Sequence, residues 1–250
     1  ITKPFSATDI LQAIERRLKK AEMKNQVFSA DLNGLGKLMQ QVTGKELLLL
    51  SEGRDMNMYK KRQYIYSEGN HPSWLFYLQK GKVKAFRRNE DGKELITQLY
   101  NEGDFLGYTA LLENTTYKDT AEAMEECKVA VVPREDFEEL LYSNNEVAVQ
   151  LARLLARNVT IKEQQLIGLA YNSLRKKVAE ALVSLQQKYN PHGTSTFTID
   201  ISRDNLAAIA GTATESVVRT LAQFREEGLI DVKSGAVVIL DEKKLSSMLY

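Results

Sequence analysis

The sequence predicts an α+β fold in which an antiparallel β-sandwich or β-roll is followed by a long helix and then by a winged helix-turn-helix. Short β-branched and aromatic runs between residues 63 and 133 predict the sheets. A leucine-rich stripe at helical spacing from Leu151 to Leu169 predicts the long helix. Two short helical patterns and a hairpin between residues 202 and 240 predict the winged motif. We therefore expect four parts, namely a terminal segment with a linker helix (1–27), the roll (28–145), the long helix (146–172) and the winged domain (173–250).

Glycines divide the β-rich part at nearly even intervals. Gly69, Gly81, Gly92 and Gly103 are 12, 11 and 11 residues apart, a spacing typical of successive turns in an antiparallel roll. The dipeptide Asp91-Gly92 favours a tight turn between two of the strand-like runs. Those runs are Gln63–Tyr66, Trp74–Leu78, Val83–Phe86, Leu95–Tyr100 and Lys128–Val132.

The long helix carries an apolar stripe that a second helix could bury. A homodimer formed through this stripe is our expectation. Packing of the stripe against the chain's own domain is the alternative, and the pattern leaves both open. The stripe consists of Leu151, Leu155, Val159, Leu166 and Leu169.

The predicted winged motif begins at Ser202, a favoured helix N-cap residue, and its first helix ends at Gly211. A second helix begins near Thr214, and so short a join with a glycine is typical of a helix-turn-helix. Residues 229–233 and 236–240 then predict two strands joined by a two-residue turn, which form a wing. The apolar positions expected to face the core are Leu206, Ile209, Ala210, Val217, Leu221 and Phe224.

Three polar residues are then turned outward at the start of the second helix, where a recognition helix meets base edges: Glu215, Ser216 and Arg219. Arg219 can donate two hydrogen bonds to guanine, and Glu215 can accept from cytosine N4, each worth about 1 to 3 kcal/mol of discrimination. The alternative is an ordinary surface pair between Glu215 and Arg219, worth about 0.2 to 0.5 kcal/mol. The residues expected to contact phosphates of double-stranded DNA are Ser202, Arg203, Thr212, Thr214 and Lys233.

Charge alone gives no indication of nucleic-acid binding, because the net charge is +1 and residues 201–235 hold four basic and five acidic side chains. Residues 153–177 are basic, with six Lys or Arg against Glu163, so any attraction to phosphate depends on placement. We expect no enzyme, since the chain shows no recognised nucleophile-base pair or metal site. Cys127 is the only cysteine, which excludes an internal disulfide. With no long apolar run or signal segment, we expect a cytoplasmic protein that does not contact membranes.

Over residues 45–250 the sequence resembles the family of the cyclic-AMP receptor protein and FNR. The segments that carry the resemblance are Tyr66-Ser-Glu-Gly69, Leu78-Gln-Lys-Gly-Lys-Val83, Asn101-Glu-Gly-Asp-Phe-Leu-Gly107, Ser202-Arg-Asp-Asn-Leu-Ala-Ala-Ile-Ala-Gly211 and Glu215-Ser-Val-Val-Arg219. The resemblance implies a cyclic-nucleotide-binding-like jelly roll that senses an effector, a homodimer built on the long helix and a palindromic DNA site. It also implies that Glu215 and Arg219 read half-sites with a TGA-like core, and that RNA polymerase is a partner.

The effector pocket departs from the family's cyclic-nucleotide pattern. Tyr108 stands where a glutamate for the ribose is expected, and Asp119 stands near the phosphate position, where like charges repel. Lys118 can replace the missing arginine only as a point charge. We therefore predict no cofactor and no binding of cyclic AMP; a regulatory protein that binds a cyclic nucleotide or another small ligand is the alternative. The pocket residues that the resemblance indicates are Gly107, Tyr108, Thr109, Lys118, Asp119 and Lys162.

The first residues resemble the end of a response-regulator receiver domain. Lys3-Pro4-Phe5 matches the lysine and proline after its fifth strand, and the amphipathic segment to Leu18 matches its last helix. The segment therefore looks like the remnant of a longer protein. The hypothesis that follows is control by phosphorylation of an upstream receiver domain, with a sensor histidine kinase as partner.

Overall fold

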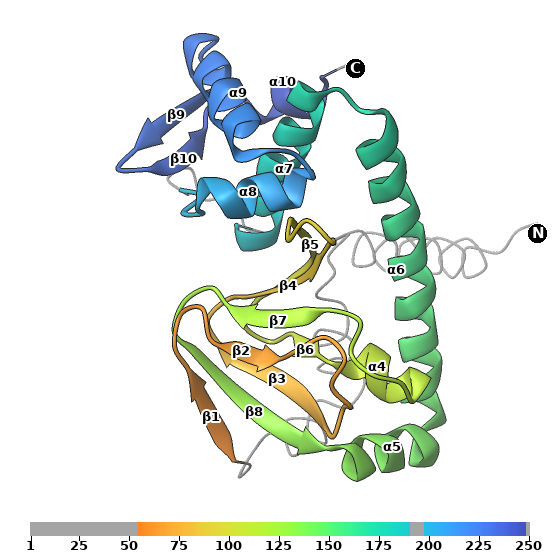
Figure 1. The fold of residues 1–250 in the computed structure, drawn as a ribbon. Coiled ribbons are helices and arrows are strands. Elements are labelled where there is room, and N and C mark those ends of the chain that lie inside the picture. The colour runs from red at the N-terminus through yellow and green to blue at the C-terminus, as the bar shows by residue number, and fades with distance from the viewer. Residues whose placement is uncertain (1–54, 191–197, 249–250) are drawn as a thin grey trace, which may run out of the picture. The chain divides into compact units, whose positions relative to one another are not determined.

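The structure, a computed structural model, describes residues 55–190 and 198–248 (Figure 1). The segment predicted to be a receiver-domain remnant, residues 1–27, lies outside this part of the chain. Within the described residues, no helix is both long and apolar enough to cross a membrane.

Two four-stranded antiparallel sheets form the roll (Figure 1). The first sheet has the strand order β1-β8-β3-β6 and the second has the order β2-β7-β4-β5. Aromatic and aliphatic side chains from both sheets, among them Phe76, Val83 and Leu106, fill the space between them. The strands are β1 (Met56–Tyr59), β2 (Tyr64–Tyr66), β3 (Trp74–Lys80), β4 (Val83–Arg88), β5 (Glu94–Tyr100), β6 (Phe105–Leu106), β7 (Thr120–Ala123) and β8 (Cys127–Pro133).

All five predicted runs are strands, and the predicted roll is confirmed. The strands β1, β6 and β7 were not predicted. β7 reads Thr-Ala-Glu-Ala, which is poor in the residues that favour strands, and it pairs with β2 and β4 because its alanines fit the crowded interior.

Helices cover the outer face of the first sheet. Successive side chains of a strand point to opposite faces, so Leu75 faces these helices while Phe76 faces the roll interior. Leu75 and Val132 pack with Phe137 of α5 and with the first turns of α6. The helices of this layer are α4 (Tyr108–Glu113), α5 (Arg134–Ser143) and α6 (Asn145–Tyr171).

The apolar stripe predicted for α6 is divided between two environments. Leu151 is 5% exposed and lies with Leu155 in the core of the chain's own roll. Val159 and Leu166 are 57% and 68% exposed. The assignment of Leu151 to a subunit interface therefore needs correction, because the first turns of α6 already bury their apolar side against the first sheet. Only the exposed half of the stripe is available to a second copy.

The winged domain comprises α7 (Leu174–Tyr189), α8 (Arg203–Ala210), α9 (Thr214–Glu226), β9 (Ile230–Lys233), β10 (Ala236–Ile239) and α10 (Glu242–Ser246). Its core contains residues of every helix in the domain, including Leu182, Leu206 and Phe224. Leu99 of β5 belongs to the same buried cluster, and Ile96 packs against it. The winged domain and the outer face of the second sheet therefore share apolar contacts.

Candidate nucleic-acid interface

The first helix of the winged motif begins and ends as predicted. The hydroxyl of Ser202 accepts a hydrogen bond of 3.1 Å from the backbone N–H of Asn205, which caps α8. The helix ends at Gly211, whose φ of 63° is the left-handed conformation that glycine adopts without strain. A Cβ at this position would lie 2.7 Å from Cδ2 of Leu169 on α6, so a larger residue would also require the end of that side chain to move.

The second helix, α9, buries Val217, Leu221 and Phe224, as predicted. Glu215 and Arg219 are exposed and Ser216 is partly buried. Among the described residues, Glu215 and Arg219 make neither an ion pair with each other nor a hydrogen bond to another side chain. The alternative of a stabilising surface pair is therefore not realised, and both side chains are available to a ligand.

The wing is an antiparallel hairpin in which Lys233 pairs with Ala236. Both residues of its turn have positive φ, 50° at Ser234 and 86° at Gly235, which is the pattern of a type I′ turn. Lys233 is exposed, with its Nζ 3.8 Å from a carboxylate oxygen of Asp231. This leaves an ammonium group at the outer end of the wing.

Arg203 has a different environment from the one that its predicted phosphate contact requires. Its Nη2 donates to the carbonyl oxygen of Gly235 at 3.1 Å, and its Nη1 is buried without a hydrogen-bond partner. The side chain is partly buried, and its bond to Gly235 ties the start of α8 to the wing turn. Arg203 therefore joins two parts of the motif, whereas Lys233 extends into solvent.

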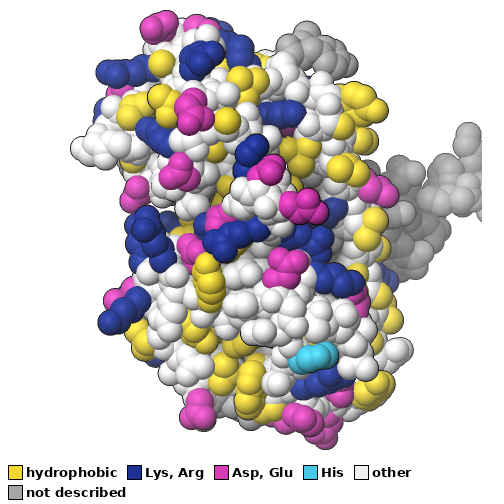
Figure 2. Space-filling model, in the orientation of Figure 1, with side chains coloured by type: hydrophobic (Ala, Val, Ile, Leu, Met, Phe, Trp, Pro, Cys, Tyr) yellow, Lys and Arg dark blue, Asp and Glu magenta, His cyan; other side chains and the backbone are white. Residues whose placement is uncertain are grey.

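The remaining predicted phosphate contacts are hydroxyl groups near the N-termini of the two helices. Ser202 is exposed, but its oxygen already caps α8. The hydroxyl of Thr214 donates to Asp204 at 2.9 Å, which links α8 to the start of α9, and Thr212 lies partly buried in the turn. Figure 2 shows acidic and basic side chains interspersed over the visible face of this domain, consistent with its balanced charge.

Inside the roll, Asp119 is the centre of a polar cluster. It accepts hydrogen bonds from the hydroxyls of Tyr66 at 3.2 Å and Thr97 at 3.4 Å. Burial raises the pKa of Asp119 above its ordinary value, although these two hydrogen bonds act in the opposite direction. Lys162 on α6 donates to the carbonyl oxygen of Thr97 and to Gln165, and burial lowers the pKa of its ammonium group while Asp119 partly opposes that effect.

The structure brings together some of the predicted pocket residues and separates others. Asp119 and Lys162 both contact Thr97. The hydroxyl oxygen of Tyr108, at the start of α4, accepts a hydrogen bond of 3.4 Å from Nδ2 of Asn158, and Gly107 caps that helix with a φ of 84°.

Two other predicted pocket residues lie apart from this cluster. Thr109 is exposed. Lys118 instead forms an exposed ion pair of 2.7 Å with Glu113, at a bend in the chain before β7, and does not join Asp119.

Sequence reasoning did not assign Tyr66 or Thr97 to this cluster. The ring of Tyr66 stacks on Tyr117 with centroids 4.0 Å apart, so two aromatic side chains occupy space between the sheets next to Asp119. Tyr66 lies in a segment that carried the family resemblance, but its position beside Asp119 depends on the pairing of β2 with β7. The cluster therefore places the Asp119 carboxylate and two aromatic rings between the sheets, with the ammonium group of Lys162 close to Thr97.

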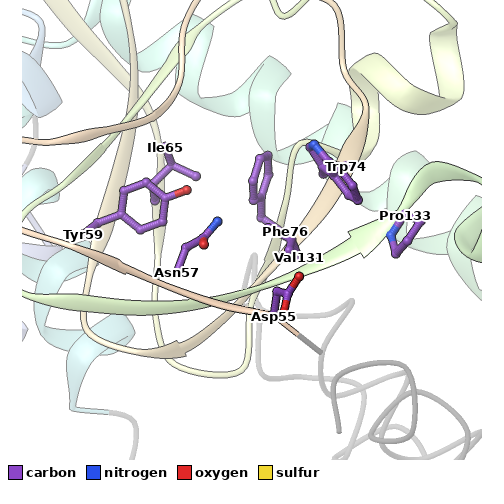
Figure 3. Close-up of a pocket in the computed structure, with 8 residues that line it drawn as sticks. All are labelled: Asp55, Asn57, Tyr59, Ile65, Trp74, Phe76, Val131 and Pro133. Carbon is purple, nitrogen blue, oxygen red and sulfur yellow. The ribbon is translucent and has the colours of Figure 1, made fainter. Parts of the chain in front are cut away.

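A separate cleft of about 440 Å³ lies at the open edge between the two sheets (Figure 3). Its walls come from β1, β3 and β8 on one side and from β2 on the other. None of the predicted effector residues lines it. The lining residues are Asp55, Asn57, Tyr59, Ile65, Trp74, Phe76, Val131 and Pro133. In the part of the chain that the structure describes, no group of His, Cys, Asp and Glu side chains is arranged to hold a metal ion.

Comparison with known proteins identifies both domains. Residues 56–144 match the cyclic nucleotide-binding domain family, and residues 176–248 match the Crp-like helix-turn-helix domain family. The chain is 27% identical over 202 residues to the transcriptional activator protein anr of Pseudomonas aeruginosa, covering 80% of this chain and 81% of that protein. It is 25% identical over 189 residues to the cAMP-activated global transcriptional regulator CRP of Salmonella typhimurium, covering 74% and 89%. The fold is shared with FixK2 from Bradyrhizobium japonicum, with a TM-score of 0.67, 21% identity and coverage of 77% and 95%.

Proposed function

Because the chain belongs to the Crp/Fnr family of DNA-binding transcription regulators, we propose that it is a sequence-specific homodimer that reads a palindromic site with Glu215, Ser216 and Arg219. The observation that carries this proposal is the exposure of Glu215 and Arg219, without an intramolecular partner, on the first turns of a helix whose opposite face is buried. A recognition helix presents such side chains to the major groove. Arg219 can donate to guanine O6 and N7, and Glu215 can accept from cytosine N4.

Contacts with phosphates position the winged domain of each copy on the duplex. Lys233 at the wing supplies a cation, and Ser202 and Thr212 supply hydroxyl groups close to the N-termini of α8 and α9. The hydroxyl of Thr214 would have to leave Asp204 to donate to a phosphate. Helix N-termini favour phosphate binding, because their free N–H groups point at the anion. The balanced charge of the winged domain predicts weak binding by a single copy, so a dimer that engages two half-sites is needed for useful affinity.

The exposed half of α6 supplies the surface for that dimer. Val159, Leu166 and Ile167 are all more than half exposed, at 57%, 68% and 58%. Burying each of these side chains would contribute about 1.5 to 3 kcal/mol. Leu169 lies further along the same helix and is partly buried. A second copy of α6 would cover these residues.

Cyclic AMP is not the effector in this proposal. The phosphate of a cyclic nucleotide would meet the carboxylate of Asp119, and Tyr66 and Tyr117 occupy neighbouring space in the roll. Isothermal titration with cyclic AMP should give no saturable heat. Phosphorylation of an upstream receiver domain by a sensor kinase is the input that we propose instead. RNA polymerase is a proposed partner, because one relative is named a transcriptional activator.

Control by a different small ligand is the second candidate. The cleft in Figure 3 favours it, because a volume of about 440 Å³ with aromatic walls suits a small organic molecule. A saturable change in the fluorescence of Trp74, the only tryptophan in the chain, on titration with cell-extract metabolites would support this candidate.

Selection of bound sequences from a random duplex pool tests the proposed function. We expect enrichment of an inverted repeat with a TGA-like core in each half. The affinity for that repeat should fall steeply with salt, because phosphate contacts release counterions. Enrichment of no sequence, or of an asymmetric single site, would contradict the proposal.

A further inference from the structure

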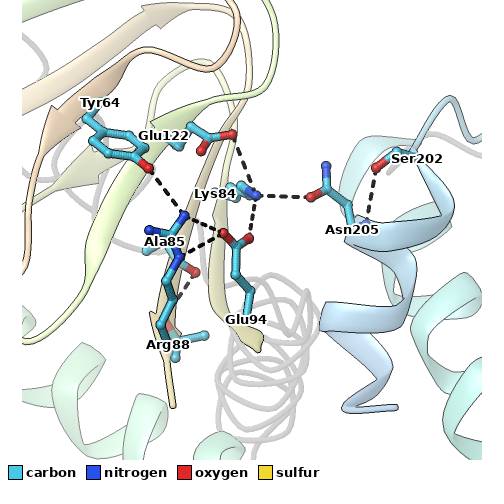
Figure 4. A network of polar contacts seen from close by, with 9 residues as sticks. Tyr64, Lys84, Ala85, Arg88, Glu94, Glu122, Ser202 and Asn205 are labelled. Carbon is cyan, nitrogen blue, oxygen red and sulfur yellow. Dashed lines mark hydrogen bonds and ion pairs between the residues drawn. The ribbon is translucent and has the colours of Figure 1, made fainter. Parts of the chain in front are cut away.

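Lys84 is a charged side chain buried where the roll meets the winged domain. It is 5% exposed and points from β4 toward the outer side of the second sheet (Figure 4). Its Nζ donates to Oε2 of Glu94 at 2.9 Å and to Oδ1 of Asn205 at 3.1 Å, and lies 3.6 Å from Oε1 of Glu122. The two glutamates belong to the neighbouring strands β5 and β7, whereas Asn205 belongs to α8.

The roll alone supplies the negative charge that a buried lysine needs. Glu94 is held in place by Arg88, whose Nη2 and Nε donate to its Oε1 at 2.8 and 3.2 Å. Burial raises the pKa of Glu94, but the hydrogen bonds from Lys84 and Arg88 outweigh that effect and hold the pKa below its ordinary value. The carboxylate therefore stays ionised, and Lys84 is fixed in one position by its own sheet.

The contact between Lys84 and Asn205 joins the roll to the start of helix α8. Asn205 is the third residue of α8, and its backbone N–H is the donor that Ser202 caps. The start of a helix carries a partial positive charge that repels a cation. Lys84 lies there because Glu94 and Glu122 offset its charge, and the amide of Asn205 turns its oxygen toward the ammonium group.

Further apolar and ionic contacts join the two domains near Lys84. Leu99 lies in the core of the winged domain, and Ile96 packs against that core. On α7, the ammonium group of Lys188 lies 3.6 Å from Asp104 of the roll, and both side chains are buried. The carbonyl oxygen of Lys188 accepts from Asn101 at 3.0 Å. The two domains thus meet through a packed contact that combines apolar side chains with the polar contacts of Lys84, Asn101 and Lys188.

We propose that Lys84 is a positioning residue for DNA binding, which fixes the orientation of α8 and hence of α9 on the roll. The inference rests on the proposed dimer and palindromic site. Two recognition helices that are each fixed to their roll have one separation, and a dimer selects half-sites at the matching spacing. Lys84 does not belong to the surface that meets DNA, since Glu215 and Arg219 are exposed on α9 while Lys84 is buried.

The substitution Lys84→Met keeps an unbranched apolar side chain that is one atom shorter, and removes the ammonium group with its hydrogen bonds. Fluorescence anisotropy of the whole chain should be measured on the selected palindrome, on palindromes with half-sites moved apart or together by one to several base pairs, and on a single half-site. The unsubstituted chain should prefer one spacing by about tenfold or more, because only that spacing lets both copies bind together. Lys84→Met should reduce this preference to about twofold while the single half-site affinity stays unchanged.

Lys93→Met is the matched control, since Lys93 precedes Glu94 but is exposed and makes no side-chain contact within the described residues. It should keep the full preference for spacing. A general loss of stability would lower affinity for the single half-site and the palindromes alike, so the ratio between spacings separates positioning from folding.

Asn205→Ala removes the same contact from the other side and leaves Lys84 paired with both glutamates. This variant serves where Lys84→Met folds poorly, because Asn205 is only partly buried. We expect the same loss of preference, and the double variant should add little to either single one. Failure of the unsubstituted chain to select any palindrome would overturn the proposed function. A selective chain whose Asn205→Ala and Lys84→Met variants keep the full preference would overturn the role of Lys84.

Discussion

The guanidinium of Arg203 donates through Nη2 to the carbonyl oxygen of Gly235 at 3.1 Å, which joins the first helix of the winged motif to the turn of the wing. Arg203 directly follows the cap Ser202, and Gly235 directly follows Ser234 in the type I′ turn. The wing turn is therefore held at a fixed distance from the start of α8. This relationship separates residues that shape the DNA-binding surface from residues that supply its charge.

Arg203→Gln should weaken binding to all DNA sequences without changing the salt dependence, because it loosens the wing but removes no phosphate contact. Lys233→Gln should instead reduce the slope of log affinity against log salt by about 1. Affinities measured over a series of salt concentrations check both. An equal fall in slope for the two variants would assign Arg203 to a phosphate.

Gly211→Ala should destabilise the chain by more than Gly228→Ala does. Both glycines have left-handed backbones, with φ of 63° and 69°, so each substitution costs about 1 to 2 kcal/mol of conformational strain. Only at Gly211 does the added Cβ also meet a neighbour, Cδ2 of Leu169 at 2.7 Å. Urea denaturation of the two variants gives the comparison, and equal losses would mean that Leu169 moves aside freely.

Asp119→Asn should stabilise the chain, and increasingly so as pH rises. Because burial raises the pKa of Asp119, the folded state holds that proton more tightly than the unfolded state does. The resulting stability is fully present below the ordinary carboxyl pKa of 3.8 and is lost as pH rises through the higher folded value. The urea midpoint of Asp119→Asn should therefore exceed that of the unsubstituted chain by more at about pH 7 than at about pH 4. Parallel pH profiles for the two proteins would show that Asp119 has no such effect.

Leu166→Glu should convert the proposed dimer to a monomer, because it places a charge in the exposed half of the α6 stripe, where Leu166 is 68% exposed. Tyr142→Glu, at an 88% exposed position on α5, is the control and should leave the dimer intact. Sedimentation velocity distinguishes the two species. A dimer that persists in Leu166→Glu would place the subunit contact elsewhere.

The sequence predicted most accurately those elements whose signals are local. The cap at Ser202, the glycine at Gly211 and the turn at Ser234 each depend on the chemistry of one residue and its neighbours, and the structure confirms these helix and strand boundaries. The buried face of α9 follows from spacing alone. Short strands without β-branched residues, such as β7, gave no comparable signal.

Features that depend on contacts between distant elements could not be predicted. Residues 83–86 of β4 are all buried, Lys84 included, because the winged domain covers the outside of the second sheet. No pattern in these four residues predicts that cover. The predicted stripe on α6 includes both Leu151 and Leu166, although Leu151 is buried against the roll and Leu166 is exposed. The separation of Lys118 from Asp119 likewise depends on how the segment before β7 runs.

Repeating the selection from random duplexes with Arg219→Ala tests the central claim most directly. Arg225→Ala is the matched control, because Arg225 is an exposed arginine in the last turn of the same helix, with its Nε 3.9 Å from Asp231. We predict that Arg219→Ala loses the preference for one base in each half-site, at a cost of about 1 to 3 kcal/mol on the preferred sequence, while Arg225→Ala keeps the selected motif. An unchanged motif for Arg219→Ala would contradict the assignment of α9 as the helix that reads the sequence.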